Sequence, residues 1–132
     1  SLGFHKTKAS NFKYIVDEIS KIGYVPDNRE YLESLKGVGR KTASVVLGEL
    51  FNIPSFAVDT HVYRVSKRLG ITNSKDDVLK TEMKLKKYFD EKDWNRINSQ
   101  LVLFGRYHCK SKNPNCESCK LKDICKEKIP NK

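Results

Sequence analysis

Apolar residues recur at intervals of three and four along most of the chain, which is the spacing of one face of an α-helix. The first such segment runs from about 6 to 22 and is ended by Gly23. No stretch alternates between apolar and polar residues as a half-buried strand does, so the pattern predicts an all-α fold. The apolar positions of the first segment are Phe12, Ile15, Val16, Ile19 and Ile22.

The second half of the chain predicts three further helices. The first begins after Asp59, which is a natural N-cap, and is ended by Gly70. The second runs from an N-cap at Ser74 to about Phe89, and the third spans about 93 to 108. The apolar faces that we expect are Val62, Val65 and Leu69; Val78, Leu79, Met83 and Phe89; and Trp94, Ile97, Leu101, Phe104 and His108.

Two helical segments, 29–35 and 40–51, flank a short glycine-containing connection at the centre of the first half. Gly37 and Gly39 stand two residues apart, and this predicts a tight hairpin between the helices. Such a turn directs free N–H groups of a helix N-terminus toward an anion, for example a nucleic-acid phosphate. By pattern alone this helix-hairpin-helix interpretation and a plain helical turn are about equally supported, because Gly-x-Gly elements are common.

Two polar residues near the hairpin are candidates for chemistry. Lys41 lies in the first turn of its helix, roughly opposite the stripe of Ala43, Val46 and Leu50, so it does not face that helix's own core. Asp59 has a structural explanation as a helix cap. A chemical role requires both side chains at one pocket, where the amine acts as a nucleophile and the carboxylate moves protons or stabilises a cationic sugar. The sequence alone does not show that the two converge.

The chain is strongly basic. It has 26 Lys and Arg against 16 Asp and Glu, which gives a formal net charge of +10 and a pI of about 9.5. This balance predicts a polyanionic partner. The sequence has no long apolar run and no amphipathic anchor, so we expect no membrane association.

Four cysteines, Cys109, Cys116, Cys119 and Cys125, follow the last predicted helix at spacings of six, two and five intervening residues. A cluster so compact suits a metal centre in a reducing compartment better than a disulfide scaffold. Zinc usually binds two Cys-x2-Cys pairs or similar, whereas this loop contains one such pair. An iron-sulfur cluster also takes four cysteines. Spacing alone leaves the two kinds of centre equally supported.

The run Leu35-Lys36-Gly37-Val38-Gly39-Arg40-Lys41-Thr42-Ala43, followed by Val58-Asp59-Thr60-His61, resembles the endonuclease III family of DNA glycosylase/AP lyases. That family belongs to the helix-hairpin-helix superfamily of base-excision repair enzymes. The cysteine spacing closely matches the family's C-terminal cluster loop, and the resemblance extends from Leu2 to about Cys125. It departs at Lys36, where the family usually has proline. The adenine-specific branch of the superfamily is also similar, but it lacks a lysine at the position of Lys41.

The resemblance implies a bifunctional DNA glycosylase and AP lyase that acts on duplex DNA carrying an oxidised pyrimidine or an abasic site. It implies that Lys41 is the nucleophile, that Asp59 is its catalytic partner, and that the four cysteines hold a [4Fe-4S] cluster. The alternatives are a non-catalytic helix-hairpin-helix DNA-binding module, an inactive fragment of such an enzyme, or a metal-containing scaffold with no nucleic-acid role. We expect an intracellular monomer, cytoplasmic and nucleoid-associated if the source is a prokaryote.

Further residues are candidates for DNA contact. Phe4 lies where the similar enzymes insert a hydrophobic wedge into the base stack, although a helix-entry hydrophobe is the commoner role for such a residue. A solvated surface is likewise the commonest place for a lysine. The other candidates are Lys36, Gly37, Val38 and Gly39 in the hairpin, and Arg106, Lys110 and Lys112 at the cysteine loop.

The resemblance also implies a division of the chain. Residues 1–54 would form part of a six-helix barrel, with the helix-hairpin-helix at about 29–51, and residues 55–132 a helical domain with the cluster loop at 109–125. Only three of six barrel helices are present, and the chain begins without Met, so we expect a piece of a longer enzyme. Two apolar stripes, Phe12/Ile15/Ile19 and Val46/Leu47/Leu50, would then be partly open to water, and stability and activity would be reduced.

Overall fold

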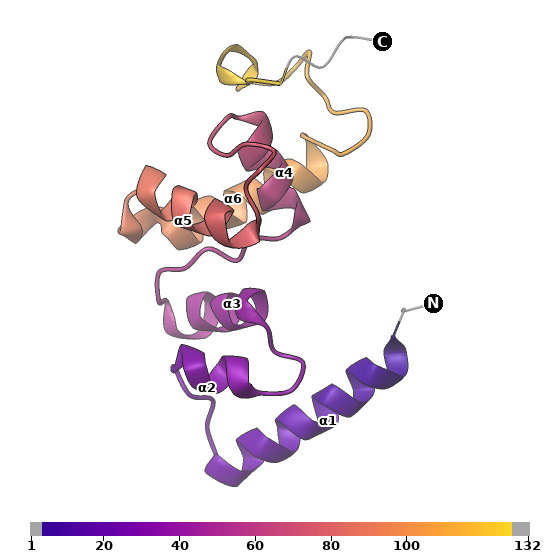
Figure 1. Cartoon of the computed structure of the whole chain (residues 1–132), viewed down its shortest axis with the longest axis vertical. Helices are drawn as coiled ribbons and strands as arrows, with labels where there is room; N and C mark the ends of the chain where they lie inside the picture. The colour runs from indigo at the N-terminus through magenta and orange to yellow at the C-terminus, as the bar shows by residue number, and fades with distance from the viewer. Residues whose placement is uncertain (1–3, 128–132) are drawn as a thin grey trace.

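The structure is a computed structural model that describes residues 4–127, and every regular element in this range is helical, which confirms the predicted all-α class. In Figure 1 the α2–α3 pair lies between α1 and the group formed by α4, α5 and α6, and the cysteine loop lies at the far end. The elements are α1 (His5–Ile22), α2 (Arg29–Ser34), α3 (Arg40–Phe51), α4 (Thr60–Arg68), α5 (Val78–Tyr88) and α6 (Trp94–Tyr107), with short 3₁₀ turns η1 (Glu91–Asp93) and η2 (Lys122–Ile124).

Helix α1 is largely open to solvent. It ends at Gly23, whose φ of 79° lets its N–H bond back to the carbonyl of Ile19, as the sequence predicts. No residue of α1 is buried, and Phe12 is 70% exposed. Phe12 therefore lacks most of the roughly 1.5–3 kcal/mol that full burial of a large apolar side chain contributes.

The hairpin between α2 and α3 depends on one glycine. Gly37 has a φ of 89°, and a Cβ there would lie 2.5 Å from the Nδ2 atom of Asn11 on α1. Gly39 has extended backbone and nothing within 4 Å of an added Cβ, so the conformational requirement expected for both glycines applies to Gly37 alone. Figure 1 shows α2 and α3 lying side by side.

A small hydrophobic cluster holds the hairpin together. Its buried members are Leu32, Ala43 and Leu47, with Val38 packed against them. Leu50, which the sequence places on the same stripe, is 63% exposed. The expectation of open stripes therefore holds for Phe12 and Leu50 and is wrong for Leu47, which is 3% exposed.

The larger cluster lies between α4, α5 and α6. Val62, Val65 and Leu85 are completely buried in it. Helices α4 and α6 pack closely because Gly105 has no side chain: a Cβ there would lie 2.8 Å from the Cβ of His61. Replacement of Gly105 by any other residue would force α4 and α6 apart.

The prediction for α5 is wrong in two respects. The N-cap is Asp77, whose carboxylate accepts a 2.7 Å hydrogen bond from the N–H of Lys80, and Ser74 does not cap the helix. The buried face is Thr81, Glu82 and Leu85, whereas the expected face is exposed at Val78, Leu79 and Met83. The buried face thus carries Leu85 together with Glu82, whose carboxylate pairs with Arg40 of α3 and with Lys86.

The connection between the two clusters is buried rather than loose. Ser55 to Val58 are all buried, and the N–H groups of Ser55 and Ala57 donate to the side-chain oxygens of Asn95 and Asn98 at 2.9 and 3.1 Å. The proposed division at residue 54 stays a prediction. Between residues 4 and 127 no helix has the length and apolar character needed to cross a bilayer.

Candidate active site

Lys41 and Asp59 line the same pocket. The pocket has a volume of about 710 Å³ and lies where α3, α4 and α5 begin, with Lys41, Asp59 and Val78 among its wall residues. The two side chains, whose relative placement the sequence left open, thus border one pocket. Because helix N-termini carry a partial positive charge, this arrangement favours a negatively charged ligand near the pocket.

Asp59 caps α4 with one of its two oxygens. Its Oδ1 accepts 2.8 Å hydrogen bonds from the N–H groups of both His61 and Val62, which confirms the predicted cap. Within residues 4–127 its Oδ2 accepts none. Capping and proton transfer therefore do not compete for the same atom, and one carboxylate can serve both.

Lys41 lies in the first turn of α3 and its side chain is exposed. The helix N-terminus expected beside it is present, whereas the described chain does not desolvate its amine. The N-cap is Gly39, and no side chain caps the first turn. The first N–H groups of α3 thus stay free to bind an anion, as the hairpin interpretation requires.

The residue before Lys41 is tied to α5. The Nε and Nη2 atoms of Arg40 donate to the two carboxylate oxygens of Glu82 at 2.6 and 3.0 Å, and Lys86 lies 2.8 Å from the same carboxylate. Burial by itself raises the pKa of Glu82, but the hydrogen bonds from Arg40 and Lys86 outweigh it and hold that pKa below its usual value. Glu82 is therefore a buried, ionised carboxylate.

The four cysteines line a second pocket of about 390 Å³, and all are partly buried. Burial and the three neighbouring cysteines raise the pKa of the Cys116 thiol. Within residues 4–127 no three His, Cys, Asp or Glu side chains converge tightly enough to hold a single ion.

A group larger than one ion fits this cavity. His108 lines the same pocket, and its Nε2 is buried with no hydrogen-bond partner in the described chain. A sulfur-rich group bound by the four thiols would supply an acceptor for that nitrogen. The residues present are therefore compatible with a cluster held by four cysteines.

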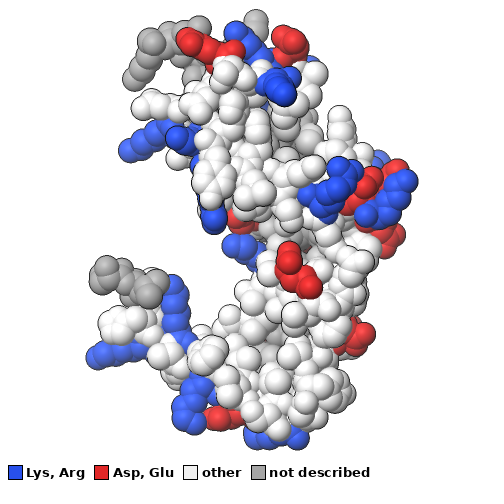
Figure 2. All heavy atoms as spheres, turned by 180° about the vertical axis from the view of Figure 1, so that it is seen from behind, with Lys and Arg blue, Asp and Glu red and all other residues white. Residues whose placement is uncertain are grey.

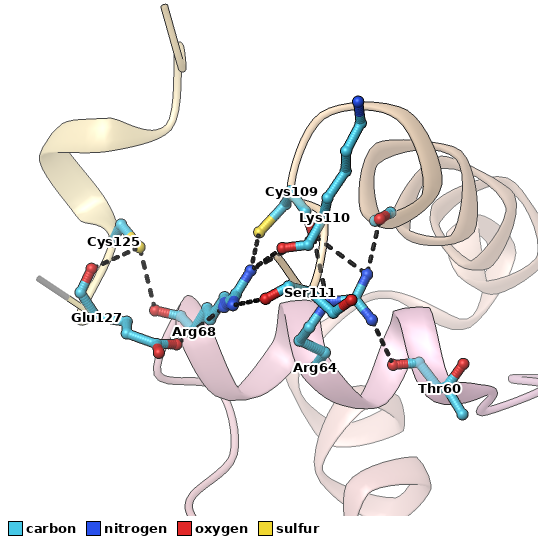
Figure 3. Close-up of polar contacts among 9 residues, drawn as sticks. Thr60, Arg64, Arg68, Cys109, Lys110, Ser111, Cys125 and Glu127 are labelled. Atoms are coloured by element: carbon cyan, nitrogen blue, oxygen red, sulfur yellow. Dashed lines mark hydrogen bonds and ion pairs between the residues drawn. The ribbon is translucent and has the colours of Figure 1, made fainter. Parts of the chain in front are cut away.

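Two arginines that the sequence reasoning missed hold the cysteine loop on α4 (Figure 3). Arg68, which is buried, donates to the Sγ of Cys109 at 3.3 Å and to the carbonyl of Lys110 at 2.7 Å, and it pairs with Glu127 at 3.0 Å. Arg64 donates to the carbonyl of Cys109 at 3.2 Å. The signal that was available is their four-residue spacing, which places both on one face of α4.

The remaining candidates for DNA contact lie in three segments of the chain: the start of α1, the hairpin, and the end of α6 with the cysteine loop. Lys36, Arg106, Lys110 and Lys112 are all exposed, and Figure 2 shows Lys and Arg side chains spread along one face of the molecule. Phe4 is 84% exposed at the start of α1 with a φ of 60°, so it is not packed as a helix-entry hydrophobe. The two residues before it, Leu2 and Gly3, lie outside the described chain.

Comparison with known proteins gives consistent matches. A sequence model of the HhH-GPD superfamily of base excision DNA repair proteins matches residues 1–91. The chain is 46% identical over 131 residues to endonuclease III of Bacillus subtilis, which covers 96% of this chain and 59% of that protein. It is 45% identical over 133 residues to endonuclease III of Haemophilus influenzae, and this match covers 98% of this chain and 63% of that protein.

A solved structure gives the same match. The fold superposes with a TM-score of 0.91 and 43% identity on a trapped endonuclease III–DNA covalent intermediate, over 96% of this chain and 60% of that one. The chain thus spans less than two thirds of the length of these proteins.

Proposed function

We propose that this chain, which belongs to the HhH-GPD superfamily of base excision DNA repair proteins, carries the active site of a DNA glycosylase with AP lyase activity. The substrate is duplex DNA with an oxidised pyrimidine or an abasic site. One observation carries the proposal: Lys41 in the first turn of α3 and Asp59 at the N-cap of α4 line one pocket. A nucleophile and a carboxylate that face the same cavity are the pair that covalent catalysis at a sugar carbon needs.

The reaction begins with a base outside the stack, since a damaged base pairs poorly and leaves the duplex at lower cost. The Nζ of Lys41 forms a bond to the sugar C1′ as the bond from C1′ to the base breaks, and the base leaves with the electron pair. Asp59 stabilises the positive charge that develops on the sugar and accepts a proton from the attacking amine. The C1′–O4′ bond then breaks, O4′ takes a proton from Asp59, and C1′ and Nζ are left joined as a Schiff base.

Strand cleavage follows from that Schiff base. Loss of a proton from C2′ makes an enamine, which expels the 3′ phosphate as the leaving group and breaks the C3′–O bond. At an abasic site the same sequence starts from the aldehyde, with water lost as the Schiff base forms. We assign the proton transfers in both cases to Asp59, which lines the same pocket as Lys41.

DNA contacts outside the pocket position the duplex. We assign the uncapped first turn of α3, with Gly37, Val38 and Gly39, to one phosphate group, and Lys36 beside it to the neighbouring backbone. Phe4, exposed at the start of α1, is assigned to the base stack as a wedge. A second contact to the backbone comes from Arg106, Lys110 and Lys112.

We assign Cys109, Cys116, Cys119 and Cys125 to a [4Fe-4S] cluster, supported by their shared cavity and by similarity to endonuclease III. When bound, the cluster would cross-link the loop through four thiolates and so hold its lysines in place. We further propose that the protein acts as a monomer inside the cell, in the cytoplasm if its source is a prokaryote.

The cofactor assignment predicts about four irons per chain and no stoichiometric zinc in protein purified without oxygen. Metal analysis by mass spectrometry measures both. Cys116→Ser should lose iron, loosen the loop and weaken binding to duplex DNA, whereas Ser118→Ala, at an exposed neighbouring position, should keep the full iron content. One zinc per chain in place of iron would contradict the assignment.

Cleavage of a duplex that contains one abasic site tests the proposed function. We expect cleavage on the 3′ side of the site, and binding that weakens as salt rises. A DNA-binding module without catalysis would bind with the same salt dependence and leave the strand intact. A metal-containing scaffold would neither bind nor cleave. Either of these two outcomes would overturn the proposed function.

A further inference from the structure

The two halves of the candidate active site belong to different hydrophobic clusters. Lys41 is carried by α3, whose buried residues Ala43 and Leu47 pack within the hairpin cluster. Asp59 directly precedes α4, whose residues Val62 and Val65 pack in the larger cluster. Within residues 4–127, therefore, no shared apolar core sets the separation of the two side chains.

Polar contacts join the clusters at the two ends of α3. At the C-terminal end, Asn95 of α6 accepts from the N–H of Ser55 and donates to the carbonyl of Ile53. At the N-terminal end, the contact is the bidentate pair between Arg40 and Glu82. Two attachment points fix both the position and the direction of α3 relative to α5 and α6.

The attachment at the N-terminal end adjoins the pocket directly. Arg40 is the residue before Lys41, and Glu82 is carried by α5, which begins at the pocket wall with Val78. A guanidinium bound through two of its nitrogens to both oxygens of a carboxylate fixes an angle as well as a distance. Displacement of this pair would shift the first turn of α3, and Lys41 with it.

Stability is a weak reason for such a pair. The side chain of Glu82 is 3% exposed, and removal of a carboxylate and its cationic partners from water costs free energy that offsets much of what their attraction contributes to stability. Apolar residues of similar size often hold two helices together equally well. What an apolar contact does not supply is the fixed geometry of the bidentate pair.

We propose that the Arg40–Glu82 pair is a positioning clamp that holds Lys41 at its working distance from Asp59. The importance of the clamp for catalysis rests on the proposed function, whereas its mechanical role does not. Arg40 and Glu82 act through Lys41 and contact no reacting atom.

Three variants and one matched control separate this role from general stability. Arg40→Gln and Glu82→Gln each remove the bidentate pair. Arg40→Lys keeps the positive charge but loses the two parallel N–H donors of the guanidinium. The control is Lys84→Gln, which breaks the pair between Lys84 and the buried carboxylate of Asp76 at 2.6 Å. That pair resembles the clamp in exposure, 42% and 7% against 44% and 3%, but it does not reach α3.

The first measurement is the single-turnover rate of Schiff-base formation at saturating abasic duplex, trapped by borohydride. Arg40→Gln and Glu82→Gln should both be about 10-fold to 100-fold slower, since a displacement of about 1 Å can cost that much. Arg40→Lys should be intermediate and Lys84→Gln close to the unmodified chain. Because Glu82→Gln keeps the charge of Arg40, equal slowing in both variants excludes a direct contact between Arg40 and DNA. Rates at the Lys84→Gln level in both would overturn the clamp.

The second measurement does not depend on activity. Amide hydrogen exchange from Ala43 onward, where α3 has its first hydrogen-bonded N–H group, should be about 10-fold faster in Arg40→Gln and unchanged in Lys84→Gln, because only the former loses the attachment. If the unmodified chain traps no DNA, the proposed function fails and hydrogen exchange alone decides on the clamp. If the amide exchange rates of α3 in Arg40→Gln then equal those of the unmodified chain, the clamp proposal is wrong.

Discussion

Lys41→Gln is expected to abolish the covalent adduct between the chain and abasic DNA while it leaves duplex binding nearly unchanged. Glutamine is of similar length and polarity but has no nucleophilic amine, so no Schiff base can form. The substitution removes one positive charge from a chain with a formal net charge of +10, and most of the electrostatic attraction to DNA remains. Borohydride reduction followed by denaturing electrophoresis measures the adduct, and fluorescence anisotropy measures binding.

The matched control is Lys87→Gln, which removes the same charge from an exposed position near the end of α5. It should trap abasic DNA as the unmodified chain does. If Lys41→Gln forms the adduct at the rate of this control, another amine is the nucleophile and Lys41 has no covalent role.

Asp59→Asn is expected to slow strand cleavage by about 10²–10⁴-fold, the usual contribution of a general acid–base group. Asparagine caps a helix about as well as aspartate, and its side-chain oxygen can still accept from the N–H groups of His61 and Val62. The free energy of unfolding should therefore change by less than about 1 kcal/mol.

Chemical denaturation and single-turnover cleavage, measured on the same preparations, separate the two roles of Asp59. Asp59→Ala removes the cap as well as the carboxylate, so it should cost about 1 kcal/mol of stability beyond Asp59→Asn. Normal cleavage by Asp59→Asn together with reduced stability of Asp59→Ala would leave Asp59 as a helix cap alone.

The helix bounds and caps that depend on residues close together in the chain could be predicted from the sequence. The bounds of α1 and α3 and the cap at Asp59 follow from helical spacing, from Gly23 and from a single carboxylate before a helix. The buried face of α5 could not be predicted in this way. That face carries Glu82, a charged residue whose partner Arg40 stands 42 residues away, and local spacing does not indicate such a contact.

The candidate site likewise has a part that the sequence predicts and a part that only the packing of the helices determines. The sequence motifs identify Lys41 and Asp59, but only the packing of α3, α4 and α5 brings them to one pocket. The four-residue spacing of Arg64 and Arg68 places both on one face of α4, but it does not identify the partners of Arg68, which lie more than 40 residues away in the cysteine loop and at Glu127. The assigned DNA contacts, from Phe4 to Lys112, stay predictions.

Location of the DNA adduct on the unmodified chain tests the central claim most directly. The chain is incubated with a duplex that contains one abasic site, reduced with borohydride, digested with nuclease and protease, and analysed by tandem mass spectrometry. The account predicts one modified residue, with the reduced sugar remnant on the Nζ of Lys41. A remnant on any other amine, or none where the strand is cleaved, would contradict it.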